Sequence, residues 1–277
     1  MAEKDLPLPV STSHPPEFVP AALECYQGAV ECLEQAGIPF AVAGAFALHQ
    51  HTGIWRSTKD LDIVLDAAVV PEALKKLERR GFRTEIKDPV WLAKAYCGEY
   101  FVDLITALGN AALLVDSSWI ERSVPYLLFG VPCRVLGAEE IIASKIFVSR
   151  RERFDLADVA HLIRAVGERL DWKRLRHLMS GHEELLLWSL VFFAYVYPAQ
   201  VGVIPRELWN RLLQGLQRHL DDPRADAPFR GTLIDPNMFA IDVKEWGERD
   251  LYRENCEQHP RLLQAKAQSK SESGSGI

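Results

Sequence analysis

The segment AVAGAFALHQHTGIWRSTKDLDIVLD, residues 41–66, decides the fold prediction, because it places two carboxylates one residue apart in an apolar run. Side chains alternate between the faces of a β-strand, so Asp60 and Asp62 point the same way, with backbones about 7 Å apart. Leu61 and Ile63 point to the opposite face, as in a strand packed on a core. Neighbouring carboxylates repel each other, and burial strengthens the repulsion. A bound divalent cation would resolve this conflict; the alternative is a solvated strand edge.

A third acid, Asp103, lies in the apolar run EYFVDLIT, which also has the character of a strand. An aspartate in such a run costs stability unless it is paired or bound to a metal. If this strand neighbours that of Asp60 and Asp62, the three carboxylates converge. Three acids can hold two Mg²⁺ ions about 4 Å apart, which stabilise the attacking and leaving oxygens in phosphoryl-type transfer. We therefore expect all three aspartates to be catalytic metal ligands.

The residues upstream of these acids suit a ligand that carries phosphate. An apolar strand ends at Gly44, and a helix is predicted from Ala45. A glycine there lets backbone amides approach a phosphate, and the helix N-terminus adds positive partial charge. The alternative for the glycine is a tight turn without a ligand. Arg56, Ser57 and Thr58 provide a cation and two hydroxyl groups for triphosphate oxygens.

The pattern of predicted secondary structure changes once along the chain, near Gly137. Before it, short strand-like runs alternate with helical patterns, and from Glu139 onward the pattern is helical. The front half is therefore α+β and the back half helical. Strands are expected at 39–43, 61–65, 82–86 and 100–105, with a hairpin over 124–135 turning near Gly130. Helices are expected at 18–36, 45–50, 71–81, 139–149, 154–167, 171–179, 183–197 and 206–220.

Composition excludes some classes of protein. A net charge of -6 is unlike that of a strongly basic nucleic-acid binder, although a local basic strip would still allow RNA binding. The five cysteines include no CxxC pair, which favours a reduced, cytoplasmic protein. The most apolar run, residues 185–197, is shorter than the roughly 20 residues that span a bilayer, and the N-terminus has no apolar signal region. We expect no membrane partner.

Three motifs together resemble the nucleotidyltransferase superfamily, whose fold is that of DNA polymerase β. The family pattern is hG[GS], then Dh[DE]h, then a distant h[DE]h, where h is apolar; Gly44-Ala45, Asp60-Leu61-Asp62 and Asp103 match it in order. Ala45 departs from the usual glycine or serine and offers no hydroxyl group. The resemblance implies a nucleotidyltransferase fold with a mixed β-sheet flanked by helices, followed by an all-helical C-terminal region. The expected parts are a flexible N-terminal segment (1–17), the catalytic core (18–137), a helical domain (138–222), an irregular or helical extension (223–266) and a disordered tail (267–277).

A second resemblance lies in residues 135–163, VLGAEEIIASKIFVSRRERFDLADVAHLI. This segment is similar to the helical part of AbiEii-type and other minimal nucleotidyltransferases, and to small aminoglycoside nucleotidyltransferases. Lys145 matches their lysine, and Asp155 and Asp158 match their acids, which implies a catalytic lysine and a contribution of both acids to nucleotide binding. From the residues alone, Lys145 could equally be a surface lysine. The acids could orient it, receive a substrate amine or hydroxyl, or stabilise a helix N-terminus.

The sequence thus predicts an Mg²⁺-dependent enzyme that moves an NMP group from an NTP to an acceptor hydroxyl. Asp103 would also serve as base toward that hydroxyl. RNA or protein as acceptor fits the toxin-like resemblance, and a small molecule fits the aminoglycoside-type one. Arg150, Arg151 and Arg153 would contact an RNA backbone or form a solvated turn. The alternative function is a catalytically inactive nucleotide-binding or toxin–antitoxin partner protein, which Ala45 favours and the three intact acids oppose.

Overall fold

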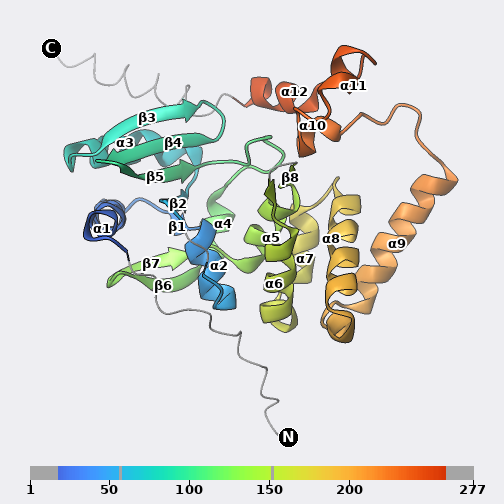
Figure 1. The fold of residues 1–277 in the computed structure, drawn as a ribbon, viewed down its shortest axis with the longest axis horizontal. Helices are drawn as coiled ribbons and strands as arrows, with labels where there is room; N and C mark the ends of the chain where they lie inside the picture. Colours follow the sequence, from blue (N-terminus) through green and yellow to red (C-terminus); the bar gives the residue numbers. More distant parts are fainter. Residues whose placement is uncertain (1–17, 56–57, 151–152, 260–277) are drawn as a thin grey trace, which may run out of the picture. The chain divides into compact units, whose positions relative to one another are not determined.

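The computed structural model describes residues 18–55, 58–150 and 153–259. The chain forms two compact units (Figure 1). One is built on the residues up to Gly137 and takes in the chain from Cys256, and the other comprises Ala138–Asn255. The segment expected to be flexible, 1–17, and the tail expected to be disordered, 267–277, lie outside the described residues.

A mixed sheet forms the centre of the first unit, and the described residues give it seven strands in the order β3-β4-β5-β2-β1-β7-β6 (Figure 1). The pairs β2·β5 and β1·β7 are parallel, and the other neighbours are antiparallel. This mixture of directions brings strands from distant parts of the chain side by side. The strands are β1 (Ala41–Val42), β2 (Asp60–Val64), β3 (Arg83–Asp88), β4 (Leu92–Cys97), β5 (Tyr100–Ile105), β6 (Val124–Leu128) and β7 (Val131–Val135).

Strand β2 has the alternation that its sequence predicts. Leu61 and Ile63 are fully buried, whereas Asp60 and Asp62 are partly exposed. Burying each of these apolar side chains contributes about 1.5–3 kcal/mol, which holds the strand in place although its other face carries two acids. Helix α1 packs on β5 and β7, and α3 packs on β3. The helices of this unit are α1 (Pro20–Gln35), α2 (Gly44–Thr52), α3 (Val70–Arg79) and α4 (Ser117–Glu121), with a 3₁₀ turn at Ala67–Val69.

The second unit is mainly helical. Helix α5 packs on α6 and α7, and α8 packs on α6 and α9, around the buried side chains of Ile142, Ile146, Leu156 and Phe193. A hairpin of two-residue strands, β8 (Ser149–Arg150) and β9 (Arg153–Phe154), interrupts the helices. Among the described residues, no helix is long and apolar enough to cross a membrane. The helices are α5 (Ala138–Ile146), α6 (Leu156–Val166), α7 (Trp172–Leu178), α8 (Glu183–Val196), α9 (Arg206–Asp221), α10 (Gly231–Ile234), α11 (Ala240–Lys244) and α12 (Leu251–Gln258), with 3₁₀ turns at Gly167–Arg169 and Pro198–Val203.

The predicted fold class is confirmed: a mixed sheet flanked by helices precedes a helical region. The hairpin near Gly130 is also confirmed, because β6 and β7 are joined there by a glycine with φ +82°. Strand β4 is absent from the sequence prediction. Its Ala93-Lys94-Ala95 segment has low strand propensity, and its pairing with both β3 and β5 outweighs that preference.

Candidate functional site

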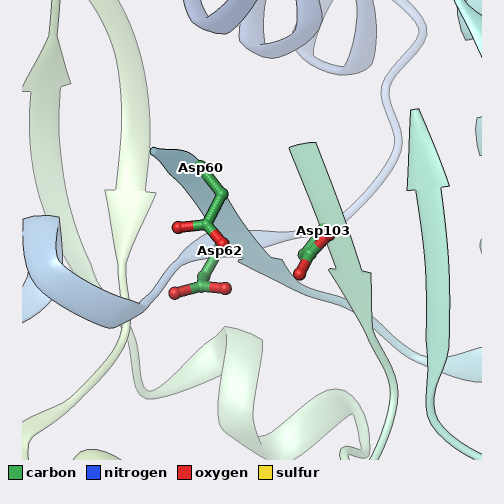
Figure 2. Close-up of side chains that lie close together, drawn as sticks. All are labelled: Asp60, Asp62 and Asp103. Atoms are coloured by element: carbon green, nitrogen blue, oxygen red, sulfur yellow. The ribbon is translucent and has the colours of Figure 1, made fainter. Parts of the chain in front are cut away.

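Three aspartates from two adjacent parallel strands gather on one face of the sheet. Asp60 and Asp62 lie on β2 and Asp103 on β5, with Asp62 directly opposite Asp103 in the register. One carboxylate oxygen from each residue lies within 4.8 Å of the others. Figure 2 shows the Asp103 side chain on the strand beside the one that carries the other two. The parallel pairing therefore brings together the three acids that the sequence singled out.

The electrostatics of this cluster favour a bound cation. Asp103 is buried, and this burial raises the pKa of its carboxyl group. The charge of Asp60 adds to the rise, while a hydrogen bond from Lys94 opposes it. The clustered carboxylates are thus only partly compensated by the protein itself. Hard oxygen ligands from a rigid sheet suit Mg²⁺, so the donor set fits the expected metal.

Gly44 supports the position of Asp62. It has φ +56°, a conformation that favours glycine, and it is the first residue of α2. A Cβ atom at this position would lie 1.9 Å from Oδ2 of Asp62. The backbone nitrogen of Ala43 also donates a hydrogen bond to the carbonyl oxygen of Asp62, at 2.8 Å. The carboxylate of Asp62 therefore occupies the space that a side chain at position 44 would need. The sequence alone does not reveal this reason for the glycine.

The structure describes two of the residues expected to bind phosphate beside Gly44, and their surroundings differ. Thr58 donates a hydrogen bond from its hydroxyl group to Oδ1 of Asp60 at 2.5 Å, which fixes that carboxylate. Ala45 is half-buried in the first turn of α2, at the positive end of the helix. Arg56 and Ser57 lie outside the described residues.

Lys94, which sequence analysis missed, is a cation that the described part of the chain brings to this site. It lies on β4, opposite Asp103 in the register, and its Nζ atom is 2.6 Å from Oδ1 of Asp103. The same Nζ atom lies 3.9 Å from the centre of the Phe101 ring. The side chain is only 16% exposed, so the ammonium group is held by an ion pair and a cation–π contact in a partly desolvated setting.

Lys145, Asp155 and Asp158 form a separate cluster within the second unit. The Nζ atom of Lys145, in the last turn of α5, lies 2.8 Å from an oxygen of each acid. Burial acts to raise the pKa of Asp155, but hydrogen bonds from Arg153 and the charge of Lys145 outweigh it, and the pKa falls below its usual value. Both acids therefore orient the lysine, one of the interpretations that the sequence left open.

No protein-family model matches the chain, and no curated protein matches it. Among solved structures it is similar to the antibiotic-resistance factor ANT(2'')-Ia, with 16% identity over 58% of this chain and 91% of that chain and a TM-score of 0.42. It is similar to an antigenic nucleotidyltransferase-like protein from Paracoccidioides brasiliensis, with 16% identity, coverage of 68% and 95%, and a TM-score of 0.40. It is also similar to the lincosamide antibiotic adenylyltransferase LnuA, with 16% identity over 48% of this chain and 90% of that chain and a TM-score of 0.35. Similarity at this level says nothing of the function or the substrate of this chain.

Proposed function

We propose that the protein is a nucleotidyltransferase that transfers an NMP group from an NTP to an acceptor hydroxyl and releases pyrophosphate. The observation that carries this proposal is the convergence of Asp60, Asp62 and Asp103, with oxygens within 4.8 Å of one another on adjacent strands. A rigid set of three acids has little structural purpose, because each adds repulsion to the folded state. Two bound Mg²⁺ ions would supply neutralisation of charge on the phosphates and on the leaving group.

The side chains of the site would have distinct tasks in this proposal. Asp60 and Asp62 would hold the metal ions, with Asp60 fixed by the hydroxyl group of Thr58 and Asp62 seated against Gly44. Asp103 would complete the metal site and serve as base toward the acceptor hydroxyl. Positioning of the reacting groups and electrostatic stabilisation would supply most of the rate.

The phosphates would be held mainly by main-chain groups at the start of α2. Gly44, the first residue of α2, lies against the carboxylate of Asp62, and amide groups at the start of a helix bind anions. Arg56 and Ser57 would add to this site. Lys145, whose Nζ atom is held by Asp155 and Asp158, would be a catalytic lysine, as its resemblance to minimal nucleotidyltransferases implies.

Thermal melting with each NTP, with and without Mg²⁺, tests this function. A ligand that binds the folded state raises the melting temperature by mass action. We expect one or more NTPs with Mg²⁺ to stabilise the wild type and not Asp62→Asn. Glu72→Gln is a matched control, because Glu72 is an exposed acid on α3 that pairs only locally, with Lys76 at 3.3 Å. The absence of any shift in the wild type would overturn the proposal.

The acceptor is tested separately. Binding of RNA through Arg150 and its neighbours would weaken steeply with salt, whereas a small molecule would show a slight dependence. Arg153 is already engaged with Asp155 at 2.9 Å, which leaves fewer guanidinium groups for phosphate contacts. Mass spectrometry of candidate acceptors after incubation with NTP detects the added NMP. Nucleotide binding without any turnover would instead support an inactive nucleotide-binding protein.

A further inference from the structure

We propose that Lys94 is a positioning residue that occupies Asp103 in the metal-free protein and must release it when a metal ion binds. This inference rests on the proposed function, because it concerns how the same acids acquire their metal. Lys94 would weaken the binding of a free divalent cation, so that metal enters the site together with the nucleotide.

The register of three strands places Lys94 in direct competition with a metal. Asp62 lies opposite Asp103 across β2 and β5, and Lys94 lies opposite Asp103 across β5 and β4. Paired residues share a face of the sheet, so the three side chains form one row with Asp103 in the middle. The Nζ atom of Lys94 is 2.6 Å from Oδ1 of Asp103. Mg²⁺ binds carboxylate oxygens at about 2.0–2.1 Å, and an ammonium group at that oxygen would repel it.

The ammonium group of Lys94 also has other favourable contacts when it leaves Asp103. Its Nζ atom already lies 3.9 Å from the centre of the Phe101 ring, so release from Asp103 need not remove that contact. On its other side, Lys94 lies opposite Glu85 of strand β3, a second carboxylate in the row that already pairs with Lys87 at 2.8 Å. Exchange of the lysine for a metal therefore leaves the ammonium with favourable neighbours.

The burial of the pair makes the competition strong. The side chains of Lys94 and Asp103 are only 16% and 12% exposed, so water screens their interaction weakly. The free energy of that ion pair is subtracted from the binding of a bare cation. An NTP brings negative charge that compensates the metal ion and attracts the released ammonium. Metal and nucleotide should consequently bind with positive coupling.

Calorimetric titration of Mn²⁺ into the protein without nucleotide tests the inference. We expect Lys94→Met to bind Mn²⁺ at least about tenfold more tightly than the wild type, equivalent to about 1.4 kcal/mol. Lys94→Arg, which keeps the charge, should remain close to the wild type. Without metal, Lys94→Met should melt at a lower temperature, because Asp103 loses its cation, and Mn²⁺ should raise this temperature more than in the wild type. A merely structural lysine would lower stability and leave metal affinity unchanged or weaker.

The outcomes separate this inference from the proposed function. Tighter binding in Lys94→Met that is lost in Lys94→Met/Asp62→Asn supports the inference. Equal or weaker binding in Lys94→Met, with wild-type binding that depends on Asp62, overturns it and leaves the proposed function standing. Binding by Lys94→Met and none by the wild type, even with NTP, supports the competition and contradicts the proposed function. Absence of binding in both proteins overturns both.

Discussion

Replacing Gly44 with alanine probes the contact on which the geometry of the acid cluster depends. The alanine would keep φ at +56°, which costs roughly 1–2 kcal/mol for a residue with a Cβ atom. That Cβ atom would also lie 1.9 Å from Oδ2 and 2.8 Å from Cγ of Asp62, so the carboxylate or the turn must move. Overpacking of this kind costs about 1–3 kcal/mol. The expected loss is therefore about 2–5 kcal/mol of the free energy of unfolding.

Two further variants separate these contributions in urea denaturation. Gly37 has a similar φ of +66°, and its Cβ would meet no atom within 4 Å, so Gly37→Ala should show the backbone cost alone. In an Asp62→Ala background the two shortest contacts are absent and only the one with Cβ of residue 62, at 3.1 Å, remains, so Gly44→Ala should cost little more than Gly37→Ala. The double-mutant cycle then gives a coupling of about 1–3 kcal/mol between Gly44 and Asp62. Equal costs of Gly44→Ala in both backgrounds would refute the reasoning.

Three other changes test other contacts of the two units. Thr58→Val removes the hydrogen bond to Asp60 and should weaken Mn²⁺ binding about tenfold in calorimetry, whereas Thr58→Ser should retain it; unchanged binding in the valine variant would contradict the role of Thr58. Lys145→Met should lower the free energy of unfolding by about 3–5 kcal/mol, because it leaves two buried acids without their shared cation. Adding Asp155→Asn and Asp158→Asn to this variant should recover part of the loss, as measured by urea titration. Burial and then the charge of Arg230 lower the pKa of His182, so the imidazole binds a proton less readily in the folded state than in the unfolded state. The contribution of His182 to stability is therefore complete above about pH 6.5 and declines as the pH falls toward the folded pKa. The urea midpoints of His182→Gln should lack this decline.

The sequence predicts the acids and their faces because the period of a strand is short and local. Asp60 and Asp62 alternate with apolar residues, and this alternation alone determines that they share a face. Their proximity to Asp103 depends on parallel pairing of β2 with β5, between which α3 and the β3–β4 hairpin intervene. That pairing is a property of the whole sheet. The sequence can therefore predict that the three acids converge only if the two strands are neighbours.

Lys94 was missed for a related reason. It lies between two alanines, in a segment whose propensity hides strand β4, and without that strand its neighbour Asp103 is not visible. Thr58 is predicted to bind a phosphate, and the structure adds that its hydroxyl group donates a hydrogen bond to an acid two residues away. In both cases residue types indicate a polar site; the partner of Lys94 is set by the pairing of β4 with β5, whereas that of Thr58 is a local contact along the chain.

Gly44 shows how one residue can meet two demands. Its positive φ starts α2 beside β2, which brings the amide end of the helix to the carboxylate of Asp62. The partial positive charge there stabilises an anion, and both Asp62 and a phosphate are anions. A metal ion held by Asp62 would therefore lie beside the amide groups proposed for the triphosphate, which couples the two binding events. Metal and nucleotide affinity should for this reason fall together in Gly44→Ala, whereas Lys94→Met should tighten the binding of Mn²⁺ in the absence of nucleotide.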